Sequence, residues 1–155
     1  MPVPSCFKLE GMSAPTLLID AQGSWAGESV LYLPWMPEEA DQVQKSHSRM
    51  TVEIDRQNAF ALVRYTWSYQ GEEQDGTMLI CGETAGWSDS MHQKGEVMSL
   101  KGADANLLGK YAMEGHPEWG WRIRFSRDGE DLLMEMFNIS PEGEEMPAVH
   151  AVYRR

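Results

Sequence analysis

The sequence predicts an all-β fold, a barrel of about ten antiparallel strands. From Gly23 onward, short segments rich in β-branched and aromatic residues alternate with turn residues, a pattern typical of strands. The connections between these segments are too short for parallel crossovers, which need a dozen or more residues. Closing such a series into a barrel leaves no unpaired edge strand. We therefore expect residues 23–155 to form one barrel domain, preceded by an N-terminal extension of residues 1–22.

The expected strands follow one another directly along the chain. We place them at residues 24–33, 46–54, 59–69, 77–81, 87–92, 97–100, 108–114, 119–125, 132–139 and 148–154. A helix fits only at residues 13–21, where it would be short, or at residues 38–44. In the segment 119–125, large apolar residues alternate with Gly and Arg, so we expect the apolar set to face the interior. The alternation in the last strand does not decide which side His150 occupies.

Composition limits the classes of function. The chain has 155 residues, of which 42% are hydrophobic, enough for one domain with a buried core. The formal net charge of −11 argues against sequence-independent nucleic-acid binding and against docking on anionic membranes. The two cysteines, Cys6 and Cys81, form no metal-binding spacing, and we expect Cys81 to be a small buried hydrophobe. Without a signal sequence or a long apolar run, we expect a cytoplasmic protein.

Two sets of residues carry a resemblance to known barrels. Gly23-Ser24-Trp25-Ala26-Gly27 resembles the Gly-x-Trp-x-Gly opening of calycin barrels, the group of lipocalins, fatty-acid-binding proteins and nitrobindins. Trp87-Ser88-Asp89-Ser90, the segment 134–145 and the terminal Tyr153-Arg154-Arg155 resemble the bacterial domain-of-unknown-function family 1579. The resemblance implies a lipocalin-like barrel in which Trp25 closes one end, with Arg154 or Arg155 packed over its ring. That family has no settled activity, so the resemblance implies no functional residues.

The large side chains suggest a ligand site inside the barrel. Six tryptophans and eleven methionines favour a wide interior with broad, adaptable walls, as in small-molecule pockets. The alternative is that they fill a barrel core. We expect reversible binding of a small, partly hydrophobic or amphipathic molecule in the lumen. The expected apolar contacts are Trp67, Trp87, Met91, Trp119, Trp121 and Met134.

Asp89 is the expected polar handle for that ligand. It shares a strand face with Trp87 and Met91, so an inward orientation would place a carboxylate among apolar groups. Such a group must find a partner or stay protonated. Arg64, Arg122 or Arg124 could pair with it, and Arg122 or Arg124 could also orient a ligand. The alternative is a hydrogen bond at a strand end that holds a turn.

Three other functions stay open. The nitrobindin resemblance raises haem binding through His150, although no cofactor or metal is otherwise expected. An enzyme acting on a hydrophobic ester or peroxide would use Asp89 and His92, but Ser88 and Ser90 stand at even spacing along a strand and form no triad. We therefore predict no catalytic residue. A filled barrel that acts through its surface, for example as a homodimer, is the third alternative.

Overall fold

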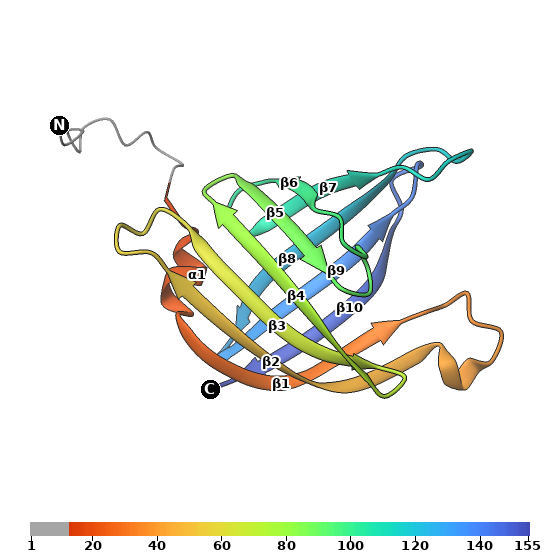
Figure 1. The fold of residues 1–155 in the computed structure, drawn as a ribbon, viewed down its shortest axis with the longest axis horizontal. Coiled ribbons are helices and arrows are strands. Elements are labelled where there is room, and N and C mark those ends of the chain that lie inside the picture. The colour runs from red at the N-terminus through yellow and green to blue at the C-terminus, as the bar shows by residue number, and fades with distance from the viewer. Residues whose placement is uncertain (1–12) are drawn as a thin grey trace.

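The chain folds into a closed barrel. In a computed structural model, which describes residues 13–155, ten antiparallel strands pair in the order β1-β10-β9-β8-β7-β6-β5-β4-β3-β2, and β2 pairs with β1 (Figure 1). The predicted fold class and the predicted number of strands are therefore confirmed. Neighbours in sequence pair with each other all the way round, so the topology is a simple meander closed by β1 and β10.

The strands match the expected segments in order and differ from them mainly at their ends. They are β1 Gly23–Tyr32, β2 Val43–Ile54, β3 Ala61–Tyr69, β4 Glu72–Cys81, β5 Thr84–Asp89, β6 Met98–Lys101, β7 Asn106–Tyr111, β8 Trp119–Asp128, β9 Asp131–Ile139 and β10 Glu145–Arg154. The clearest difference is β4, which begins five residues before the expected 77–81. The tight turn at Gln70 and Gly71, both with positive φ (50° and 82°), lets the ladder start at once, and acidic side chains then project to solvent.

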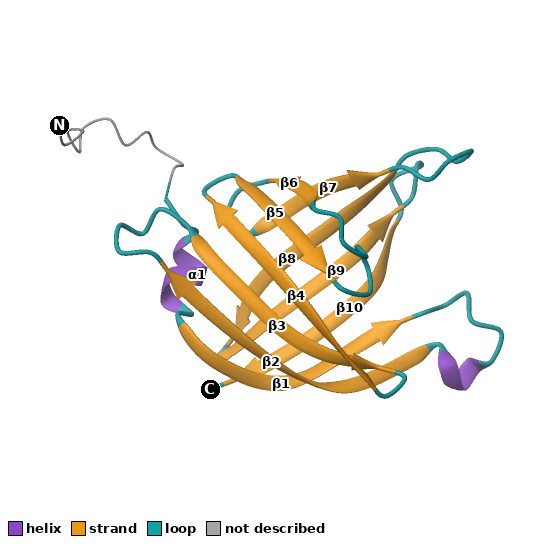
Figure 2. Cartoon of the chain, viewed as in Figure 1, coloured by secondary structure: helices purple, strands orange, loops and turns teal. Residues whose placement is uncertain are grey.

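One end of the barrel is closed by a helix, α1 Thr16–Asp20 (Figure 2). The Nε1 atom of Trp25 donates a hydrogen bond to the Ala21 carbonyl at 2.7 Å, which ties the helix to β1. The guanidinium of Arg155 lies 4.5 Å from the centroid of the Trp25 ring, and that of Arg127 lies at 5.3 Å. The expected cation–π contact is therefore made by Arg155, whereas Arg154 pairs with Asp131. The chain's last residue and its first described segment thus meet at this closed end.

The opposite end, here called the mouth, carries the longer connections. The segments 33–42, 90–97, 112–118 and 140–144 lie there, and the first contains a short 3₁₀ helix, Glu39–Asp41. None of the helices within residues 13–155 is both long enough and apolar enough to cross a membrane.

Side chains fill the interior. Trp121, Ile123 and Phe125 alternate inward along β8 and are at most 5% exposed, as the pattern predicted. The largest fully buried side chains come from most of the strands and from α1: Trp87, Tyr153, Leu18, Met50, Met78, Ile80, Leu100, Leu107, Ile123, Leu132, Met134 and Met136. The wide, open lumen expected from the sequence is therefore a packed core. Cys81 is a second correction, because it ends β4 on the outer face and is exposed rather than buried.

Candidate functional site

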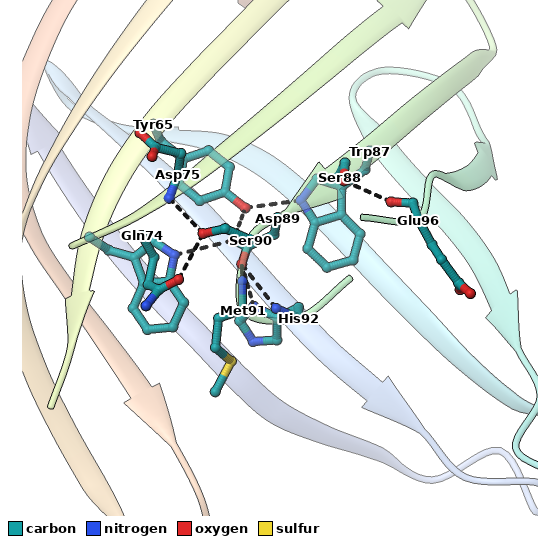
Figure 3. A network of polar contacts seen from close by, with 11 residues as sticks. Tyr65, Gln74, Asp75, Trp87, Ser88, Asp89, Ser90, Met91, His92 and Glu96 are labelled. Carbon is teal, nitrogen blue, oxygen red and sulfur yellow. Dashed lines mark hydrogen bonds and ion pairs between the residues drawn. The ribbon is translucent and has the colours of Figure 1, made fainter. Parts of the chain in front are cut away.

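A buried carboxylate lies near the mouth of the barrel. Asp89, the last residue of β5, is 1% exposed. Its Oδ2 atom accepts a hydrogen bond from the Tyr65 hydroxyl at 2.7 Å (Figure 3). The same atom accepts a second hydrogen bond from Trp67 Nε1 at 3.2 Å. Its Oδ1 atom accepts from the backbone N–H groups of Met91 at 2.9 Å and His92 at 3.0 Å. Four donors on two oxygens satisfy the carboxylate without a lysine or an arginine.

The contact between Tyr65 and Asp89 depends on a glycine between them. Tyr65, Gly76 and Asp89 pair in one row across β3, β4 and β5. A Cβ atom on Gly76 would lie 2.0 Å from Tyr65 Cζ, so only glycine leaves room for the phenol ring to cross β4. The Tyr65 hydroxyl also accepts a hydrogen bond from Trp87 Nε1 at 2.9 Å. A hydrogen-bonded chain therefore runs from Trp87 through Tyr65 to Asp89.

These contacts set the protonation states of both groups. Burial raises the pKa of Asp89, but the His92 imidazole, the Tyr65 hydroxyl and the His92 backbone N–H outweigh it and lower the pKa to about 2. Burial, together with the negative charge of Asp89, raises the pKa of Tyr65 well above its ordinary value. The pair is therefore a carboxylate and a neutral phenol at neutral pH.

His92 stands against this carboxylate, surrounded by indole rings. Its Nδ1 atom lies 3.2 Å from Asp89 Oδ1, within ion-pair distance, but makes no hydrogen bond. The imidazole centroid lies 5.5 Å from that of Trp67, 5.9 Å from that of Trp87 and 5.6 Å from that of Trp121. Trp87 and Trp121 stack on each other with centroids 5.4 Å apart and planes 9° apart. We call Trp67, Trp87 and Trp121 the indole cage.

The indole cage and the His92 ring that it surrounds contain two buried nitrogens without a hydrogen-bond partner. Within residues 13–155, the buried side-chain nitrogen or oxygen atoms without a hydrogen-bond partner are His92 Nδ1 and Trp121 Nε1. Buried polar atoms are normally paired, and an orphaned one costs about 1–3 kcal/mol. Because both orphans belong to the same cluster, this part of the barrel is the best candidate for a site completed by another molecule.

A cleft and a small cavity both adjoin His92. The cleft, about 360 Å³, opens at the mouth between the segment 90–97 and the start of the β7–β8 loop. It is lined by Trp87, His92, Gln93, Glu96, Met98, Tyr111, Ala112, Met113, Trp121 and Asn138. The cavity inside the barrel measures about 10 Å³, room for about one water molecule. It is lined by Ser29, Leu31, Tyr65, Trp67, Asp89, His92, Met134, Met136 and Val149. His92 is therefore the residue that these two linings share.

The structure brings together several of the residues predicted from the sequence. Trp67, Trp87, Asp89 and Trp121 form the cluster just described, and Met134 lines the inner cavity. Met91 packs against the core and donates its backbone N–H to Asp89. Trp119 does not join them: it is partly buried at the start of β8 and lines an outer groove with Lys110 and Ile139.

Three predicted site residues face away from the lumen. Arg122 pairs with Glu145 at 2.6 Å, and Arg124 pairs with Glu135 at 3.1 Å, both on the outer face of β8. The expectation that either arginine would meet Asp89 or orient a ligand in the lumen is wrong, since even positions of β8 point outward. His150 also projects outward and lies 3.3 Å from Glu135. It therefore does not present its imidazole to the lumen, as binding haem there would require.

The sequence reasoning missed Tyr65 and Gly76 and left His92 out of the binding site. Tyr65 stands two residues before Trp67, so strand alternation already places the two on one face. Gly76 falls in the connection expected between the strands 59–69 and 77–81, although a glycine facing a buried aromatic residue inside a strand is a signal of close approach. The cleft residues Met98, Tyr111 and Asn138 carry no such signal, because loops and the barrel end bring them together.

The arrangement does not contain a serine nucleophile. The Ser88 hydroxyl donates to the Glu96 carbonyl at 2.7 Å, and the Ser90 hydroxyl donates to Gln74 Oε1 at 2.7 Å, so neither bonds to His92. In the part of the chain that the structure describes, no group of three or more His, Cys, Asp or Glu residues is placed to hold a metal ion.

Comparisons with known proteins add no assignment. No family model matches the chain, and no curated protein matches it.

Proposed function

We propose that this protein binds a small, partly apolar molecule at the mouth of its barrel. The observation that carries the proposal is the cleft of about 360 Å³ whose walls join aromatic rings, thioethers and a few polar groups. Small-molecule sites are clefts of roughly 300–1,000 Å³ with mainly apolar walls and a few placed polar groups. The two unsatisfied nitrogens of the cluster beneath it add independent support. The proposed site therefore lies at the mouth of the barrel and not in the lumen, where the sequence led us to expect it.

The residues that line the cleft offer a ligand both apolar and polar contacts. Trp121 and Met98 form part of its apolar floor, and Met113, which is 52% exposed, stands at the rim. The Tyr111 hydroxyl donates to Asn138 Oδ1 at 2.6 Å, which fixes a polar pair beside the floor. A ligand with an apolar body and one or two polar atoms suits this surface.

The proposal is tested by filling the cleft. Ala112 lines it and is exposed, so Ala112→Trp should occupy its volume without disturbing the core. The probe is N-phenyl-1-naphthylamine, a neutral dye whose fluorescence rises in apolar surroundings. We expect the wild type to bind the dye and Ala112→Trp to weaken its binding at least tenfold.

The matched control is Ala103→Trp, which adds the same side chain at an exposed position in the β6–β7 connection, at the closed end. It should leave dye binding unchanged. Dye binding that is absent in the wild type, or that survives Ala112→Trp intact, would refute the proposal.

We also propose that the barrel is of the lipocalin-like type and related to the bacterial family that it resembles. The contact between Arg155 and Trp25 supports this, because it joins the opening motif to the terminal basic residues that carry the resemblance.

A further inference from the structure

The indole cage has the composition of a site for an organic cation. Trp67, Trp87 and Trp121 surround the imidazole ring of His92. The Asp89 carboxylate lies 3.2 Å from Nδ1 of that ring. Aromatic faces attract cations through their quadrupole, and groups of aromatic rings are the protein's usual means of holding alkylated ammonium groups. A carboxylate behind the rings adds a full negative charge in a poorly solvated position.

We propose that this cage receives the cationic group of the ligand, and that His92 is an internal occupant which the ligand displaces. The inference rests on the proposed function, since the cleft is the route by which the ligand arrives. It adds the chemical class of that ligand: a small organic cation with an apolar body, such as an alkylated ammonium or azolium ion.

The charges around the cage favour a cation over an anion. Among the residues that line the cleft and the inner cavity, the carboxylates are Asp89 and Glu96, and there is no lysine or arginine. Lys110 on β7 already lies 3.6 Å from Glu118 in an ion pair, and Lys94, two residues after His92, is exposed and does not line the cleft. An anion would therefore meet no positive side chain in the cage other than a protonated His92.

His92 is a poor permanent occupant of the cage. Its Nδ1 atom is buried without a hydrogen bond, although it lies beside a carboxylate. Its side chain is still 16% exposed, which leaves it a way out toward the cleft. Among residues 13–155, its one polar contact is with the Asp89 carboxylate, and an incoming cation replaces that contact as it displaces the imidazole.

The backbone around His92 does not have to move for the exchange. The backbone N–H groups of Met91 and His92 bond to Asp89, and the Gln93 N–H donates to the Asp89 carbonyl at 2.8 Å. These bonds hold the turn while the imidazole rotates away. The cation would then occupy the place of the imidazole between the cleft and the inner cavity.

The experiment opens the cage by mutation and compares two rings of similar shape. His92→Ala removes the occupant and leaves the rest of the site in place. The probes are 1,3-dimethylimidazolium, a permanent cation, and 1,3-dimethylpyrazole, which is neutral at pH 7. Binding is measured by isothermal titration calorimetry, and near-ultraviolet circular dichroism checks that the variant is folded.

We expect His92→Ala to bind the cation at least tenfold more tightly than the wild type does, and at least tenfold more tightly than it binds the pyrazole. Adding Asp89→Asn should remove the preference for the cation. The control His116→Ala removes an exposed histidine at the same end of the barrel and should behave as wild type. If the double variant does not fold, the comparison of the two rings in His92→Ala decides alone.

Equal binding of the two rings, equal binding of the cation by wild type and His92→Ala, or no binding to His92→Ala would overturn the inference. These results are separable from failure of the proposed function. If the neutral dye binds at the cleft but the cation shows no preference for the opened cage, the cleft remains a binding site and only the ligand class is wrong.

Discussion

Asp89 shows how much a single residue depends on its neighbours in space. Its partners come from β3 and from the turn after β5, and the contact with Tyr65 exists only because Gly76 has no side chain. The sequence alone placed Asp89 on the same face as Trp87, which is correct, but the expected arginine partners point to solvent. Strand alternation shows which residues share a face, whereas the partner of a buried group depends on which strands become neighbours.

The packing of Tyr65 over Gly76 predicts a large effect from one methyl group. Gly76→Ala should destabilise the barrel by about 2–3 kcal/mol, because the new Cβ would overlap the Tyr65 ring and force it from Asp89. Urea unfolding at pH 7 measures the change. Gly86→Ala in the adjacent β5 is the matched control: its Cβ would meet only Val97 Cγ1 at 3.4 Å, so it should be nearly neutral. Equal effects from the two variants would contradict this packing argument.

The low pKa of Asp89 predicts a pH dependence of stability. Folding lowers this pKa from 3.8 to about 2, so the ionised carboxylate stabilises the native state above pH 4, and that contribution is lost as the pH falls from about 4 to 2. The loss is about 2 kcal/mol. Between pH 5 and pH 2 the wild type should therefore lose about that much more free energy of unfolding than Asp89→Asn does. The comparison cancels the other carboxylates, Asp55 among them, whose backbone hydrogen bond from Phe60 helps to lower its pKa. Parallel pH profiles for the two proteins would refute the assignment.

Among the secondary-structure elements, the sequence predicted the strands well and their ends less well. Alternation and turn residues located all ten, but β2 and β10 begin three residues before their expected starts, and β5 ends at Asp89 rather than at residue 92. The added first residues of β2 and β10, 43–45 and 145–147, pair in the ladder but are exposed or half-buried, so no buried alternation marks them as strand. The helix α1 is only five residues long, and its place depends on the Trp25 side chain of β1 and not on its own propensity.

The seam between β1 and β10 leaves no room for a side chain at Gly27. Gly27 pairs with Tyr153, and a Cβ at Gly27 would lie 1.8 Å from the Val152 carbonyl oxygen. Because the obstacle is backbone and cannot rotate away, Gly27→Ala should cost about 3 kcal/mol or more. Thermal unfolding followed by circular dichroism measures the loss. Glu28→Ala, at the next and exposed position, should change little, and a Gly27→Ala protein as stable as wild type would show that the seam is looser than described.

In the whole molecule, the closed barrel is the result that the sequence predicted most completely. The meander and the inward alternation of β8 follow from local patterns, whereas the closure by Trp25 with Arg154 or Arg155 was implied by the resemblance to calycin barrels, and the structure selects Arg155. The filled interior could not be predicted from the sequence, because the number of large side chains does not show whether they line a cavity or occupy it. The packed rings of Trp87 and Trp121 together with the methionines leave only about 10 Å³ inside, and the usable space lies at the mouth.

The most direct test of this account follows the indole N–H signals of the six tryptophans in ¹⁵N-labelled protein while N-phenyl-1-naphthylamine is added. Binding at the mouth should shift the signals of Trp87 and Trp121 and leave that of Trp25 at the closed end unchanged. Shifts of Trp25 with none at Trp87 or Trp121, or no shift at any of the six, would contradict a binding site at the mouth.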